Sequence, residues 1–129
     1  MKLYRYELKS NNDEIKLDKH TGILTALEQI FEKDFEKDMD KLCNLFWFFE
    51  EYLECPNIPL SNTTSFFTEK GNRKFNKAIK NLKKAYAEKG IDVVLINEYR
   101  DNIKSIIVYE DENQVIIKRD VYEGSTTIM

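Results

Sequence analysis

Residues 68–96, TEKGNRKFNKAIKNLKKAYAEKGIDVVLI, contain the change of periodicity that decides the fold class. Thr68 can cap a helix that runs to Lys89, and Gly90 then supplies the C′ position, where a left-handed backbone is common. Residues 91–96 are rich in β-branched side chains, which favour a strand. A long helix followed at once by a strand predicts a fold that mixes the two kinds of element.

The predicted helix has one apolar and one basic face. Four apolar residues recur at helical spacing and predict its buried side: Phe75, Ile79, Leu82 and Tyr86. Four cations lie two positions away from them, or about 200° around the helix, and predict an exposed basic face: Arg73, Lys77, Lys80 and Lys84. Residues 70–89 are therefore predicted to present a binding surface to an acidic partner or to phosphates.

Two further helices are predicted before residue 60. Residues from Thr21 or Gly22 to about Phe31 suit a short helix with Thr21 as its cap. A stronger helical pattern follows, with apolar residues at spacings of four and three: Phe35, Met39, Leu42, Phe46, Phe49 and Leu53. Because Leu45, Trp47 and Phe48 widen this face, we expect the helix at the centre of the fold, with Phe46, Phe49 and Leu53 buried and Trp47 either buried or in an interface.

The remaining segments predict strands and loops. Residues 2–8 alternate like a strand, residues 105–109 and 114–118 suit a hairpin, and residues 55–65 read as a polar connector. Residues 124–129 have no periodicity and are predicted to fray. The chain is therefore predicted to be a single α+β domain over residues 1–129, with about three helices on a small, mostly antiparallel sheet that has an N-terminal strand and a C-terminal three-stranded meander.

Charge is distributed unevenly along the chain, although the formal net charge is only −3. Residues 61–90 carry eight Lys or Arg against two Asp or Glu, and the segments on either side are acidic. No apolar run approaches the roughly 18 residues that a membrane span needs, and the first residues lack the apolar stretch of a signal peptide. We therefore expect a cytoplasmic protein without a membrane partner.

Sequence signatures of common catalytic and metal sites are missing. The chain has no C-x-x-C pair, no H-E-x-x-H, no G-x-x-x-x-G-K-[ST] and no G-x-S-x-G. His20 is the only histidine, and we interpret it as a solvated loop residue. Acidic residues alternate through residues 32–40, so neighbouring carboxylates point away from each other on a helix and suit solvent better than a metal ion. No cofactor and no metal site are predicted.

Three short stretches carry a resemblance: YRYE at 4–7, FFTEKG at 66–71 and YEDENQV at 109–115. Together they resemble short proteins of phages and bacterial mobile elements. The resemblance covers about a quarter of the chain and carries no activity with it. It implies a setting in the cytoplasm of a bacterial host, where such proteins, anti-CRISPR inhibitors among them, bind and block host machinery.

The sequence leaves three functions open. The first is a non-catalytic inhibitor that binds stoichiometrically to a host protein or protein–nucleic-acid complex, for example a CRISPR or other defence component. The second is a nucleic-acid-binding protein that uses the basic helix. The third is an enzyme. An arginine on the first strand and a glutamate on a strand near the C-terminus are similar to those of ADP-ribosyltransferases, which implies an NAD site made of Arg5 with Glu110 or Glu112. The oligomeric state is left open.

Overall fold

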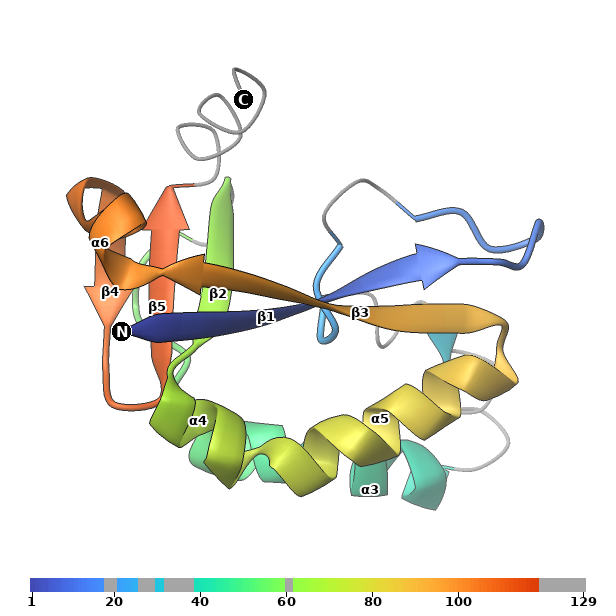
Figure 1. Cartoon of the computed structure of the whole chain (residues 1–129). Coiled ribbons are helices and arrows are strands. Elements are labelled where there is room, and N and C mark those ends of the chain that lie inside the picture. The colour runs from blue at the N-terminus through green and yellow to red at the C-terminus, as the bar shows by residue number, and fades with distance from the viewer. Residues whose placement is uncertain (18–20, 26–29, 32–38, 60–61, 119–129) are drawn as a thin grey trace. The chain divides into compact units, whose positions relative to one another are not determined.

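The computed structural model describes residues 1–17, 21–25, 30–31, 39–59 and 62–118 (Figure 1). The described strands are β1 (Lys2–Ser10), β2 (Thr63–Phe67), β3 (Ile91–Tyr99), β4 (Ile107–Glu110) and β5 (Gln114–Lys118). The described helices are α3 (Met39–Tyr52), α4 (Glu69–Lys74), α5 (Asn76–Glu88) and α6 (Arg100–Ile103), with a 3₁₀ turn, η1 (Lys104–Ile106). In this part of the chain, no helix has the length and apolar character needed to cross a bilayer.

The five strands form one antiparallel sheet in the order β3-β1-β2-β5-β4. Its longest ladder joins β2 to β5, from Thr63 opposite Lys118 to Phe67 opposite Gln114. The predicted α+β class is confirmed, as is the hairpin of β4 and β5. The three C-terminal strands do not form a meander, because β3 lies beside β1 while β5 pairs with β2. Backbone bonds from Asn11 to Gly90 and from Arg100 to Met1 join the ends of β1 and β3.

The chain divides into two compact units. The first contains Met1–Arg5, Glu54–Lys74 and Asn97–Met129, and the second contains Tyr6–Leu53 and Phe75–Ile96. Strands β1 and β3 each contribute residues to both units. The prediction that residues 1–129 form a single domain is not tested by this division, and residues 124–129 lie outside the described residues.

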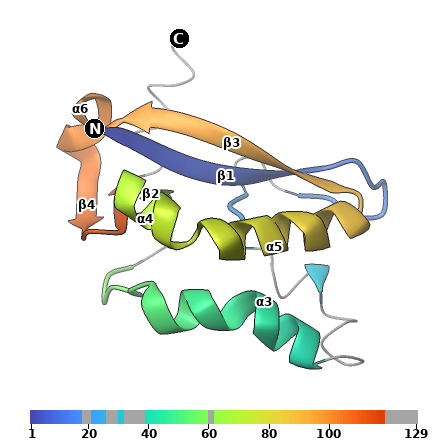
Figure 2. The same cartoon turned by 60° about the horizontal axis from the view of Figure 1, so that its bottom comes forward.

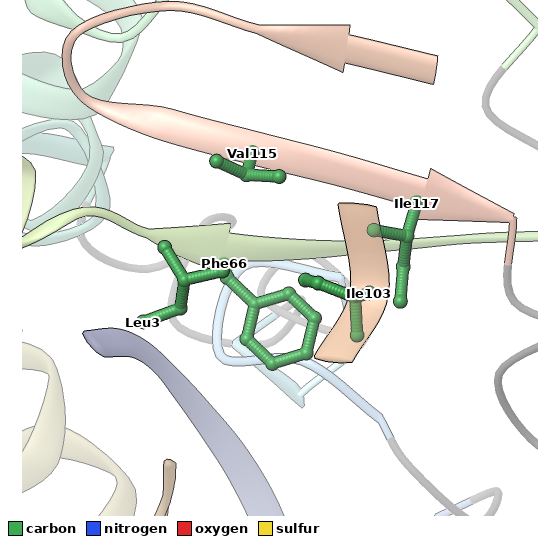
Figure 3. Packing of buried hydrophobic residues seen from close by; sticks show 5 residues of the cluster. All are labelled: Leu3, Phe66, Ile103, Val115 and Ile117. Carbon is green, nitrogen blue, oxygen red and sulfur yellow. The ribbon is translucent and has the colours of Figure 1, made fainter. Parts of the chain in front are cut away.

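The core of the first unit lies where four different elements meet. Leu3 of β1, Phe66 of β2, Ile103 of α6, and Val115 and Ile117 of β5 are almost completely buried and pack together (Figure 3). Ile106 and Ile107 cover the edge of this cluster. Because its members come from both ends and the middle of the chain, this core depends on the whole first unit being assembled.

The core of the second unit lies between α5 and its neighbours. Helix α5 runs beside α3 (Figure 2), and the Phe49 ring of α3 stacks on Phe75, with centroids 5.4 Å apart. The Tyr86 ring contacts Phe31, and its hydroxyl donates a hydrogen bond to the Ile23 carbonyl. The apolar face predicted for this helix is confirmed, because its four members are buried: Phe75, Ile79, Leu82 and Tyr86.

The prediction of a single helix from Thr68 to Lys89 is wrong in one respect. The segment contains two helices, α4 and α5, with a break at Phe75. Helix α4 is anchored at the turn after β4, whereas Phe75 is buried by the rings of α3. Both predicted ends are confirmed. The Thr68 hydroxyl accepts a hydrogen bond from the Gly71 N–H, and Gly90 has a φ of 74°, the left-handed conformation that glycine tolerates best.

Gly71 lies against the turn between β4 and β5. A Cβ added to Gly71 would lie 2.0 Å from the Asn113 carbonyl oxygen. The same oxygen accepts a hydrogen bond from the Thr68 N–H, and the Thr68 hydroxyl donates to the Glu112 carbonyl. The missing side chain of Gly71 therefore lets the first turn of α4 approach the hairpin backbone closely.

Several other predictions differ from the structure. The end of the predicted polar connector, residues 63–65, belongs to the central strand β2, which continues to Phe67. Strand β4 begins at Ile107 because η1 occupies the start of the predicted strand 105–109. A helix does not begin at Thr21 or Gly22, since Gly22 makes a β-bridge with Glu7 and residues 23–25 form a turn. Residues 26–29 of that predicted helix lie outside the described residues, as do residues 35–38 of the next one.

The expectation that α3 lies at the centre of the fold is only partly met. Phe49 is buried, as predicted, whereas Phe46 and Leu53 are half-buried. The Trp47 side chain is 51% exposed. Phe48 and Phe49 of α3 therefore pack on Phe75, whereas the Trp47 and Tyr52 rings are exposed.

Asp111 organises the turn between β4 and β5. Its Oδ1 accepts hydrogen bonds from the N–H groups of Asn113 and Gln114, and its Oδ2 accepts one from the Tyr109 hydroxyl. Burial alone would raise the pKa of this carboxyl group, but the hydrogen bonds outweigh burial and lower it. The hydrogen bond to Asp111 raises the pKa of the Tyr109 hydroxyl to about 12. The ionised form of Asp111 is therefore the form that fits the folded turn.

We expect Asp111→Asn to lower the free energy of unfolding at pH 7 by about 1 kcal/mol, because the amide nitrogen cannot accept the hydrogen bond that the Tyr109 hydroxyl donates. A carboxyl group with a lowered folded pKa stabilises the fold above its unfolded pKa of about 4, and this stabilisation is lost as pH falls through the folded pKa. Urea unfolding at pH 7 and pH 2.5 should therefore show a difference between wild type and variant that disappears in acid. Asp13→Asn, at an exposed position, is the control, and a difference that persists in acid would contradict the assignment.

Candidate binding surface

The predicted basic face lies mainly on α5. Lys77, Lys80 and Lys84 are exposed on this helix, on the side away from Ile79 and Leu82. Lys83 is exposed at the edge of the same face. Among the described residues, these four lysines have no ion-pair partner. Spacings of three, four and seven residues place Lys77, Lys80 and Lys84 in one row, so their ammonium groups can contact one partner surface together.

Arg73 does not belong to the same helix as these lysines. It is exposed on α4, in the first unit, and the interruption at Phe75 separates α4 from α5 in the chain. The nearby Lys70 is engaged, because its ammonium group lies 2.6 Å from a Glu112 carboxylate oxygen. Of the predicted site residues, the structure brings together Lys77, Lys80 and Lys84 and leaves Arg73 on a separate element.

The α5 surface has cations but no exposed ring on which a nucleic-acid base could stack. Phe75, at its start, and Tyr86, near its end, are both fully buried in the second unit. Single-stranded nucleic acids are commonly held by a basic groove with interleaved aromatic side chains. The α5 surface therefore offers charge alone, which suits an acidic protein surface or a phosphate backbone.

Two residues of the enzyme hypothesis, Arg5 and Glu110, lie on strands that are not neighbours, and the third, Glu112, lies in the turn between β4 and β5. Arg5 is on β1, is 9% exposed, and donates a hydrogen bond to the Ser65 carbonyl of β2. Glu110 is on β4, which β2 and β5 separate from β1. At about 4.8 Å per strand spacing, the β1 and β4 backbones are about 14 Å apart. The structure does not bring Arg5 together with Glu110.

Glu110 and Glu112 are each held by another cation. Arg100 makes a two-pronged contact with Glu110, at 2.7 and 2.8 Å, and lowers the pKa of that carboxyl group. Lys70 lowers the pKa of Glu112 through its hydrogen bond and charge. Both carboxylates are therefore ionised partners in surface ion pairs, and their arrangement gives no support to an NAD site.

Other residues singled out in the sequence fall partly outside the described residues. His20 and the acidic residues 32–38 are among them, and Asp40 lies on α3. In the part of the chain that is described, no three His, Cys, Asp or Glu side chains are grouped so that they could hold a metal ion.

The structure shows a second candidate binding surface, on α3, which the sequence alone did not define. Trp47, Phe48 and Tyr52 form a cluster of rings, called the aromatic patch below. The width of the apolar face around Leu45–Phe49 was the available signal, because a helix so broadly apolar must be covered or must expose rings. Which rings remain exposed depends on where α5 lies, and spacing alone does not supply that.

Comparisons with models of protein families, with curated proteins and with solved structures found no match to this chain.

Proposed function

We propose that this protein is a non-catalytic binding protein that acts by stoichiometric association with an acidic surface of a host protein. The observation that carries the proposal is the row of Lys77, Lys80 and Lys84 on α5, which is exposed and has no carboxylate partner among the described residues. A concentration of one charge sign steers a complementary partner during encounter. By its resemblance, a component of a bacterial defence system is the partner we propose.

A protein partner is preferred to nucleic acid for two reasons. The whole chain carries a net charge of −3, so a polyanion is repelled by the molecule as a whole even where it is attracted to α5. The α5 face also lacks exposed rings for stacking, as described above. An acidic patch of limited extent, such as a protein offers, matches a single row of three to four lysines better.

The test removes charge from α5 and compares it with equal charge removal elsewhere. The variant is Lys77→Gln, Lys80→Gln and Lys84→Gln, and the control is Lys9→Gln, Lys104→Gln and Lys118→Gln, which changes three exposed lysines in other elements. Glutamine keeps helix propensity, so the free energy of unfolding should change by no more than about 0.5 kcal/mol in either. Wild type should retain a protein from nuclease-treated extract of the host, and the α5 variant should retain at least about tenfold less than the control.

The nucleic-acid alternative predicts a different result. A phosphate-binding α5 would give wild-type binding to a duplex or single-stranded oligonucleotide that weakens steeply with salt, because neutralised phosphates release counterions. Such binding near physiological salt, lost in the α5 variant and kept in the control, would overturn the proposal. So would equal retention of the same proteins by the α5 variant and the control.

A further inference from the structure

The aromatic patch on α3 is exposed, yet it is held in place by the core of the second unit. Trp47 is 51% exposed and Tyr52 is 44% exposed. The Trp47 ring packs edge-on against Phe48, with ring centroids 5.6 Å apart. Phe48 in turn packs edge-on against the fully buried ring of Phe75, with centroids 5.4 Å apart. The exposed indole is therefore supported by two further rings, so little conformational freedom is lost when a partner covers it.

Carboxylates flank the indole. Glu50 and Glu51 follow Trp47 by three and four residues, the spacing that places side chains next to each other one turn along a helix. Both glutamates are exposed, and neither has a cationic partner among the described residues. The last turn of α3 contains no basic residue. An exposed indole is thus followed, one turn along the helix, by two carboxylates that have no cationic partner among the described residues.

We infer that the aromatic patch, with Glu50 and Glu51, is a docking surface for a basic segment of a partner protein that places an arginine side chain over Trp47. A guanidinium group stacks on the face of an aromatic ring, and tryptophan is the best such ring. The N–H groups of the guanidinium can at the same time donate hydrogen bonds to adjacent carboxylates. Charge complementarity therefore selects a cationic occupant, and arginine fits both the ring and the carboxylates.

This surface has the opposite charge to the α5 lysines, so the inference does not depend on the proposed function. It predicts a second contact region with its own salt dependence and its own set of disabling variants. An acidic partner surface would be repelled by Glu50 and Glu51 and would occupy α5 instead.

The test uses a fluorescein-labelled, end-capped peptide with four arginines separated by serine, and the same peptide with citrulline in place of arginine. Citrulline keeps the planar head group and removes its charge. Fluorescence anisotropy at 50 mM salt should show saturable binding of the arginine peptide and at least about tenfold weaker binding of the citrulline peptide. Because Trp47 is the only tryptophan in the chain, its emission should also change on binding of the unlabelled arginine peptide.

Matched variants separate this site from general attraction to an acidic protein. Glu50→Gln with Glu51→Gln, and separately Trp47→Ala, should each weaken binding by about tenfold. Asp13→Asn with Glu14→Gln removes the same charge from another exposed segment and should leave binding within about twofold. Circular dichroism shows whether each variant is folded. Equal weakening of peptide binding by both double variants would overturn the inference. So would self-association of the wild type that is abolished by the Glu50 and Glu51 changes, because the occupant would then be a second copy of this chain.

Discussion

Gly71→Ala should lower the free energy of unfolding by about 3 kcal/mol, although alanine is the better helix former. The added Cβ would lie 2.0 Å from the Asn113 carbonyl oxygen, a backbone atom that cannot rotate away. The oxygen can move only if the hairpin turn shifts, and that shift would strain its hydrogen bond from the Thr68 N–H. Urea unfolding at pH 7 measures the loss directly.

The sign of the Gly71 result is diagnostic. In an unobstructed helix, glycine to alanine stabilises by about 1 kcal/mol, so steric obstruction and helix propensity predict opposite changes. Asn81→Ala, at an exposed position of α5, supplies the propensity effect alone and should be neutral or slightly stabilising. A Gly71→Ala protein at least as stable as wild type would show that α4 does not approach the Asn113 backbone as described.

Tyr86→Ala should cost about 4 kcal/mol, because it removes a fully buried ring and leaves a cavity beside Phe31. Tyr86→Phe isolates the hydroxyl group. It should cost about 1–2 kcal/mol, since the Ile23 carbonyl would lose its 2.6 Å hydrogen bond in an apolar site. Burial also raises the pKa of the Tyr86 hydroxyl, as expected of a group kept neutral in the core.

The Tyr86 comparison needs an exposed tyrosine as its reference. Tyr99 is 56% exposed, so Tyr99→Ala should change the free energy of unfolding by less than about 1 kcal/mol. Both tyrosines can be measured by the same urea series. If Tyr86→Ala cost no more than Tyr99→Ala, the assignment of Tyr86 to the core of the second unit would be wrong.

Local patterns were sufficient to predict those elements whose structure depends on nearby residues. The Thr68 cap, the Gly90 C′ position and the buried face of α5 follow from helix geometry, and strand β5 has the bounds predicted from residues 114–118. Strand β2 was missed because its two threonines and one serine resemble a connector. Only the alternation of Thr64 and Phe66, both buried opposite β5, distinguishes it.

The break at Phe75 and the exposed side of α3 depend on packing between distant segments. Periodicity carries through residue 75, so no local signal separates α4 from α5, and the close approach of Gly71 to Asn113 involves residues from different thirds of the sequence. The basic residues were found by spacing, and their exposure on α5 follows from its buried face. That Arg73 lies on another helix could not be inferred from the same spacing.

The turn held by Asp111 also has a consequence for the order of folding. Glu110 pairs with Val115 across this turn, whereas β5 pairs with β2 through residues that are far apart in the chain. Closing the short loop costs much less chain entropy than closing the long one, so the hairpin can form first and offer β5 as a template for β2. A substitution that loosens the turn then acts on the folding nucleus. In stopped-flow measurements, Asp111→Asn should therefore slow folding more than it speeds unfolding.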